Sequence, residues 1–132
     1  MTTQTRRTFL ATASALTLGA STSFAMEKEN SPLVHHVFFW LKNPSSKEDL
    51  AKLIEGLRTL KKIETIKMIH IGVPASTEKR DVVDNSYSAS ELMFFDDLAG
   101  QKTYQDHPIH QKFIADCSQL WEKVIVYDAI SA

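Results

Sequence analysis

Residues 33–42, with the sequence LVHHVFFWLK, constrain the fold more than any other stretch of the chain. Aromatic and β-branched residues between Pro32 and Pro44 predict a strand here. Side chains alternate between the two faces of a strand. One face therefore carries His35, Val37, Phe39 and Leu41, and the other carries Val34, His36, Phe38 and Trp40. Both faces are largely apolar, so we expect both to be covered, one of them by something other than this chain's own helices.

The remaining apolar periodicities complete a β-α-β-β-α-α-β order. They predict a helix over 45–62, strands over 64–73, 87–95 and 123–130, a short helix after Asp96 or Asp97, and a further helix from Pro108. Ser45 and Glu48 have the spacing of a capping box. In the helix from Pro108, steps of three and four residues place on one face His110, Phe113, Ile114, Cys117 and Trp121.

This order is typical of the ferredoxin-like split βαβ arrangement, an α+β fold with a four-stranded antiparallel sheet and helices on one face. The opposite sheet face stays apolar and carries His36, Phe38 and Trp40. Pairing of two copies through their sheets would cover that surface, so we expect a homodimer with these three residues on the dimer face.

The first 25 residues have the features of an export signal. Arg6 and Arg7 precede a run of Ala, Thr, Leu and Ser that ends in the small-x-Ala pattern Ser23-Phe24-Ala25. The arginine pair resembles a twin-arginine motif, and a disordered tail is the alternative. We expect cleavage after Ala25, a short linker over 26–32, a domain over 33–131, and a periplasmic location. The run is too short and too polar for a membrane span, so no stable membrane association is expected after cleavage.

Composition limits the classes of partner. The formal net charge is −1 and no basic patch is present, which argues against nucleic acid. The single cysteine, Cys117, excludes an intrachain disulfide.

The stretch YQDHPIHQKF, residues 104–113, contains the first candidate site residues. His110 on an apolar helix face could act as a general acid or base, or be a structural histidine at the edge of the core. Tyr104 could donate to a developing oxyanion, or be a core tyrosine with a satisfied hydroxyl. His35 should face the same helices as His110.

Glu91 is a further candidate, because it lies between Ala89 and Met93 on one face of the strand over 87–95. If this face looks toward the helices, Glu91 could orient His35 or His110, or act as the base itself. If the register turns it outward, it is an ordinary surface acid.

A metal site is not expected. Pro108 separates His107 from His110, and the residue before a proline is pushed out of the helical region. No cysteine or acidic cluster completes a ligand set, so we predict no metal. No cofactor motif is present either, and we predict no cofactor.

Four segments resemble the stress-responsive dimeric A/B barrel (Dabb) domains: HHVFFWLK, FFDDL, YQDHPIH and LWEKVIVYD. The resemblance extends from about Leu33 to Ser131. It implies a ferredoxin-like monomer that pairs through its sheets into an α+β barrel homodimer. A few plant members are polyketide cyclases, which use acid–base chemistry without a cofactor in a pocket between sheet and helices.

The resemblance carries over the cyclase site only in part. It matches His35, Tyr104, His110 and Trp121, whereas the expected helix tyrosine and strand histidine fall at Gly56 and Ala89. Glu91 stands where those cyclases have apolar residues.

We therefore predict an exported homodimer with a small, mostly apolar pocket that binds a small apolar or aromatic molecule, its reaction unassigned. The pocket walls are expected to include Val37, Phe39, Phe113 and Trp121. The alternative is a cofactor-independent acid–base enzyme of polyketide cyclase or lyase type that uses His110 and Tyr104, with His35 and Glu91 as orienting groups.

Overall fold

The computed structural model describes residues 31–132, so the predicted export signal and most of the linker lie outside the described residues. Four strands and three helices follow one another in the predicted order. Their bounds, with those of two short 3-10 turns, are β1 (Leu33–Leu41), α2 (Lys47–Thr59), η1 (Leu60–Lys62), β2 (Ile66–Gly72), β3 (Ala89–Phe95), α3 (Leu98–Asp106), α4 (Pro108–Cys117), η2 (Ser118–Leu120) and β4 (Trp121–Ile130). The predicted ferredoxin-like fold is confirmed.

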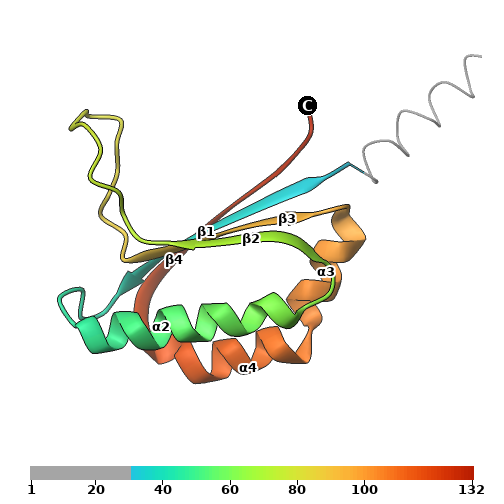
Figure 1. Ribbon diagram of the computed structural model, residues 1–132, viewed down its shortest axis with the longest axis horizontal. Helices are drawn as coiled ribbons and strands as arrows, with labels where there is room; N and C mark the ends of the chain where they lie inside the picture. The colour runs from blue at the N-terminus through green and yellow to red at the C-terminus, as the bar shows by residue number, and fades with distance from the viewer. Residues whose placement is uncertain (1–30) are drawn as a thin grey trace, which may run out of the picture.

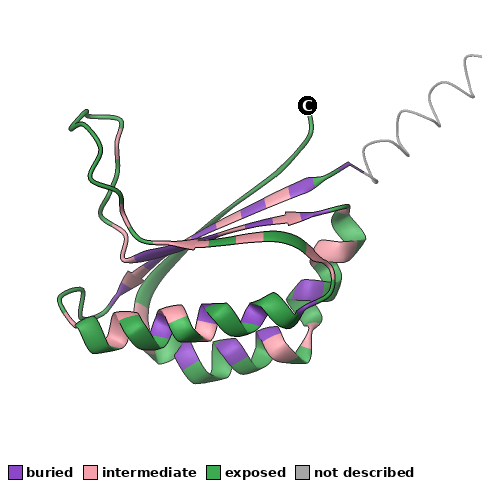
Figure 2. Cartoon of the chain, viewed as in Figure 1, coloured by how far each residue is buried: buried purple, intermediate pink, exposed green. Residues whose placement is uncertain are grey.

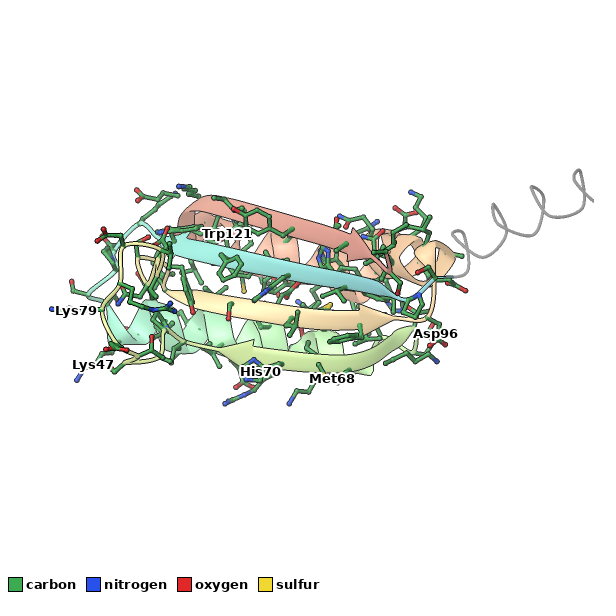
Figure 3. The ribbon with its side chains drawn as sticks, turned by 90° about the horizontal axis from the view of Figure 1, so that it is seen from above. Lys47, Met68, His70, Lys79, Asp96 and Trp121 are labelled. Atoms are coloured by element: carbon green, nitrogen blue, oxygen red, sulfur yellow. The ribbon has the colours of Figure 1, made fainter. Side chains whose placement is uncertain are left out.

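The strands form one antiparallel sheet in the order β2-β3-β1-β4. Helices α2 and α4 lie side by side against one face, and α3 lies at the end of the sheet (Figure 1). A view onto the other face shows the four strands in front and the helices behind them (Figure 3). The outer strands β2 and β4 are the edges of this sheet. Within the described residues, no helix is long and apolar enough to cross a membrane.

The core lies between the sheet and helices α2 and α4. Strand β1 alternates strictly between buried and half-buried residues, and the buried face is the predicted one with His35, Val37, Phe39 and Leu41 (Figure 2). Leu53 and Leu57 of α2 are fully buried in the same core. Strand β4 is different, because all of its residues are exposed or half-buried, including those on the helix side.

The N-cap of helix α2 lies one residue later than predicted. Its N-cap is Ser46, whose hydroxyl accepts from the backbone N–H of Asp49 at 3.1 Å, so the predicted Ser45–Glu48 capping box is wrong. The reason is a turn before the helix, in which the Ser46 N–H donates to the carbonyl of Asn43. Ser45 lies within this turn, so Ser46 is the residue whose side chain caps the helix.

Gly56 lets α2 and α4 approach each other closely. A Cβ at this position would lie 2.5 Å from Cys117 Sγ and 3.1 Å from a ring carbon of Phe113. The space left by the missing side chain is therefore filled by α4.

A proline-containing break separates α3 from α4. Asp97 caps α3 by accepting from Gly100 N at 2.7 Å, and His107 caps α4 by accepting from Ile109 N at 3.1 Å. Pro108 occupies the first turn, as expected for a residue without an N–H. The break brings Tyr104 at the end of α3 beside His110 of α4, with ring centroids 4.6 Å apart.

The prediction that Trp121 lies on the helix of His110 is wrong. Helix α4 ends at Cys117 and tightens into a 3-10 turn, after which Trp121 is extended and begins β4. Trp121 pairs with Leu41 of β1. It still reaches the aromatic residues of the core, with its ring centroid 5.0 Å from that of Phe39.

Candidate functional site

A cavity of about 150 Å³ lies between the helix side of the sheet and helices α3 and α4. It is lined by His35, Val37, Phe39, Glu91, Tyr104, Gln105, His110, Phe113, Ile114, Trp121, Val124 and Val126. All eight residues predicted as catalytic or as pocket walls lie around this one cavity. Sequence reasoning did not single out Gln105, Ile114, Val124 and Val126 as lining residues.

The cavity has an apolar wall and an apolar mouth. Phe39, Phe113 and Trp121 pack against one another with centroid separations of 5.0 to 6.3 Å. At β4 the lining becomes accessible, because Val126 is 46% exposed and Val124 is 37% exposed. Ile114 on α4, across from them, is 38% exposed. These three side chains give the cavity an apolar opening along β4.

His35 is held by a carboxylate that sequence reasoning missed. Its Nδ1 lies 2.5 Å from Oδ1 of Asp128, which is half exposed on β4. The register of β1 and β4 pairs these two residues directly, as it pairs Val37 with Val126. A carboxylate accepts from an Nδ1–H, so Nδ1 carries a proton and Nε2 is the ring nitrogen on the side of Glu91. In the sequence, the alternation of Val124, Val126 and Asp128 places Asp128 on the same strand face as the two valines. Its contact with His35 follows only once the pairing of β4 with β1 is known.

Glu91 faces the helices and is 1% exposed. Strand β3 pairs with β1 so that Glu91 is opposite Val37 on the buried face. Its Oε1 accepts from the hydroxyl of Tyr104 at 3.0 Å and lies 3.7 Å from Nε2 of His35, too far for a hydrogen bond. Its Oε2 is buried and has no hydrogen-bond partner among residues 31–132.

Burial raises the pKa of the Glu91 carboxyl to about 7, although the hydrogen bond from Tyr104 opposes this shift. A carboxylate in an apolar surrounding is costly, and one neutral hydrogen bond does not replace its hydration. Glu91 is therefore the neutral acid in mildly acidic solution and begins to ionise near neutral pH.

Tyr104 is 2% exposed and lies between Glu91 and His110. Burial, followed by the nearby Glu91, raises the pKa of its hydroxyl, so the phenol stays protonated. Its single O–H proton is directed at Glu91 Oε1. The role of Tyr104 as a donor to an oxyanion stays a prediction.

His110 has a defined tautomer. Its Nδ1 lies 3.0 Å from the carbonyl oxygen of Gln105, and because a carbonyl only accepts, Nδ1 carries the proton. Its Nε2 then keeps a free lone pair. Burial lowers the pKa of His110, with a smaller opposing effect of the Gln105 hydrogen bond. The ring is therefore neutral at pH 7 and has the form that a general base requires.

Among residues 31–132, no group of three or more His, Cys, Asp or Glu residues is arranged to hold a metal ion. His107 is occupied at the start of α4, where its Nδ1 accepts from Ile109 and its Nε2 lies 3.5 Å from Glu64. It thus acts as a connector between two helices.

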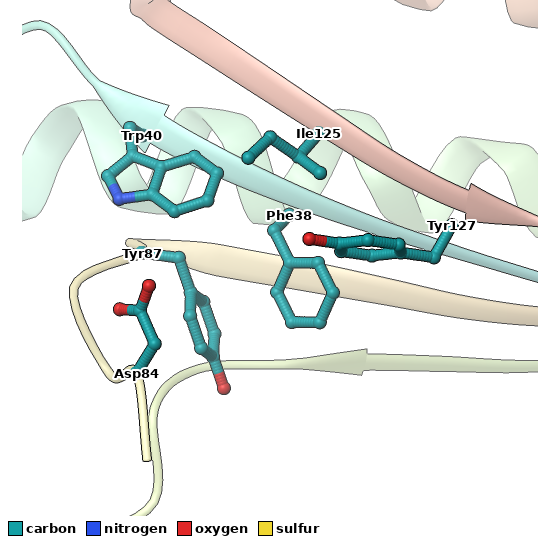
Figure 4. A pocket seen from close by; sticks show the side chains of 6 residues that line it. All are labelled: Phe38, Trp40, Asp84, Tyr87, Ile125 and Tyr127. Carbon is teal, nitrogen blue, oxygen red and sulfur yellow. The ribbon is translucent and has the colours of Figure 1, made fainter. Parts of the chain in front are cut away.

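The predicted dimer-face residues lie on the opposite side of the sheet. Phe38 and Trp40 line a shallow hollow of about 130 Å³ together with Asp84, Tyr87, Ile125 and Tyr127 (Figure 4). His36 stacks on Phe38, with ring centroids 4.2 Å apart. Tyr127 is 64% exposed. This aromatic surface, formed by Phe38, Trp40, Tyr87, Ile125 and Tyr127, is called the outer patch below.

The family model for the stress responsive A/B barrel domain matches residues 33–131. The chain belongs to this family. No curated protein matches it. The Dabb assignment agrees with the order of elements and with the sheet that is covered by helices on one face only.

Solved structures show the same fold at low sequence identity. A Dabb family protein with a ferredoxin-like fold from Mesorhizobium loti has 24% identity and a TM-score of 0.63, with 77% of this chain and 98% of that chain covered. A dimeric ferredoxin-like protein of unknown function from Thermobifida fusca has 17% identity and a TM-score of 0.63, with 78% of this chain and 93% of that chain covered. The hydroxynitrile lyase from Passiflora edulis has 19% identity and a TM-score of 0.65, with 78% of this chain and 95% of that chain covered. Proteins with this fold thus include at least one enzyme and at least one protein of unknown function.

Proposed function

We propose that this chain is an exported, homodimeric α+β barrel protein that binds a small, mostly apolar molecule in the cavity between its sheet and helices α3 and α4. The observation that carries the proposal is the cavity itself, with an aromatic wall, an apolar mouth and a few converging polar groups. Ligand sites in proteins typically have this composition. Export is supported by the arginine pair and the small-x-Ala pattern in residues 1–25, and an N-terminus at Met26 in periplasmic protein is the measurement that checks it.

Size limits the ligand to about one ring. A cavity of about 150 Å³ is comparable to those that bind benzene-sized molecules. The open side along β4 lets a longer molecule extend past Val126. We therefore choose α-methylstyrene, an apolar ring with a three-carbon substituent, as the probe.

Wild-type protein is expected to bind α-methylstyrene with a Kd on the order of 100 μM, given the limit on affinity per atom for small ligands. Val37→Phe should weaken this binding at least about tenfold, because the added ring occupies the cavity that Val37 lines. Saturation-transfer NMR or calorimetry measures both values.

The matched control is Val82→Phe, the same change at a loop residue that is 82% exposed. It should leave probe binding unchanged. Equal loss of binding in both variants, or no binding by a folded wild-type protein, would refute the proposed site.

A second candidate function is cofactor-free acid–base chemistry in the same cavity. The observation that favours it is the arrangement of polar groups, in which a neutral His110 with a free Nε2 and the Asp128-held His35 line one apolar space with Glu91. A base beside an apolar space can remove a proton from a carbon next to a carbonyl group. The lyase of the same fold from Passiflora edulis is consistent with this class of reaction.

Under this second candidate, the protein should accelerate exchange of the methyl protons of acetophenone with D₂O, a reaction that NMR follows directly. His110→Ala should slow the protein-dependent exchange at least about tenfold, because it removes the base. His107→Ala is the control, since His107 lies outside the cavity lining. Unchanged exchange in His110→Ala, with the melting temperature kept, would exclude His110 as the base.

A further inference from the structure

Glu91 presents a buried oxygen that the fold itself does not use. Its Oε1 is bonded to Tyr104, while Oε2 is buried without a partner among residues 31–132. Leaving a buried polar atom unpaired is destabilising, because the atom loses its hydration without gaining a hydrogen bond. Such atoms are rare in folded proteins and call for an explanation. Glu91 also lines the cavity, so a molecule bound there can supply the missing partner.

The hydrogen bond from Tyr104 determines which Glu91 oxygen carries the proton. Because the phenol donates to Oε1, a proton on the neutral carboxyl resides on Oε2. The Tyr104 O–H is then committed to Glu91, and the free donor of the pair is Oε2–H. Tyr104 is thus a positioning residue, and Glu91 is the group directed at the ligand.

We propose that Glu91, as a neutral acid, donates a hydrogen bond from Oε2 to a carbonyl oxygen of the bound molecule, so that the cavity selects apolar ketones or aldehydes over hydrocarbons of the same shape. This inference rests on the proposed binding function of the cavity. It assigns to the ligand an oxygen acceptor close to β3 and an apolar body directed toward the mouth at β4.

The groups around Glu91 favour this assignment. The titratable residues facing it are His35 on β1 and Tyr104 on α3, with His110 of α4 on the same cavity and Asp128 of β4 behind His35. Its neighbour on β2 is the apolar Ile71. Asp128 occupies the Nδ1 side of His35, and the distance of 3.7 Å from Nε2 leaves Glu91 without a hydrogen bond from that ring. Ionisation of Glu91 near pH 7 would remove the donor.

The test compares acetophenone with α-methylstyrene, which replaces the carbonyl oxygen by a CH₂ group. The measured quantity is the ratio of their association constants at pH 5.5. Glu91→Leu should lower this ratio about tenfold, the upper range for one net hydrogen bond in a buried site. Glu91→Gln should keep it within about twofold, because its amide oxygen can accept from Tyr104 while its NH₂ group donates to the ligand.

Raising the pH provides a second readout that does not depend on a mutation. Between pH 5.5 and 8.5 the ratio should fall in the wild type, as Glu91 loses its proton, and stay constant in Glu91→Gln. An unchanged ratio in Glu91→Leu, or the same fall in Glu91→Gln as in Glu91→Leu, overturns the inference while the binding site stands. If folded wild-type protein does not bind α-methylstyrene, the binding site and this inference are overturned together.

Discussion

Replacing Glu91 by Gln should stabilise the protein by about 3 kcal/mol at pH 8 and leave its stability almost unchanged at pH 4. The folded state raises the pKa of this carboxyl from 4.5 to about 7. The folded protein therefore holds the proton more tightly than the unfolded chain does. Wild-type stability from this group is fully present below pH 4.5 and is lost as the pH rises to about 7. A shift of this size corresponds to about 3 kcal/mol, and glutamine, which does not ionise, avoids the loss.

Urea denaturation of both proteins from pH 4 to pH 8.5, at one protomer concentration, measures the difference. Glu122→Gln is the matched control, because Glu122 is exposed on β4 and the same substitution there should leave the two pH profiles parallel. Parallel profiles for Glu91→Gln would mean that the pKa of Glu91 is the same in the folded and the unfolded protein, so that Glu91 is ionised at neutral pH. That result would also remove the basis for its role as a donor.

Introducing a charge at Tyr127 should dissociate the proposed dimer. Tyr127 lies in the outer patch, with its ring centroid 6.1 Å from that of Phe38, and is 64% exposed in the single chain. Covering the patch by a second copy would bury a carboxylate in each protomer of Tyr127→Glu, because a two-fold interface repeats every substitution. We expect the dimer dissociation constant to rise at least about a hundredfold, equivalent to about 3 kcal/mol. Analytical ultracentrifugation over a range of concentrations measures it.

Tyr127 is a better position for this test than Trp40. Trp40 donates to Ser86 at 3.0 Å and lies under the ammonium group of Lys123, so its replacement would also disturb the single chain. Ala51→Glu, on the exposed surface of α2, adds the same charge on the helix side and should leave the dimer intact. A Tyr127→Glu protein that dimerises like the wild type would show that the copies pair through another surface.

The sequence predicted the order of the elements and the two faces of β1, because alternation over nine strand residues does not depend on distant contacts. It also predicted that a break before Pro108 would separate His107 from His110. These features follow from local chemistry.

Features that depend on register or on the exact end of a helix were not predictable in the same way. The side on which Glu91 lies follows from its pairing with Val37, and Asp128 reaches His35 only because β4 pairs with β1 in one register. Trp121 continued the helical periodicity of α4 by coincidence, since the chain turns into η2 after Cys117. The cap at Ser46 was set by a turn that the periodicity does not report.

The position of β4 at an open edge gives Asp128 a second consequence, for solubility. An edge strand presents unpaired backbone groups to other chains, and an inward charge is one way in which proteins prevent such pairing. Without Asp128, the helix-side residues of β4 would form an uninterrupted apolar row from Val124 through Val126 to Ile130. A valine at position 128 would therefore add a self-association hazard to the loss of the His35 contact. Asp128→Asn keeps a polar group in the row, and it is the substitution that tests the His35 contact without making this edge strand prone to aggregation.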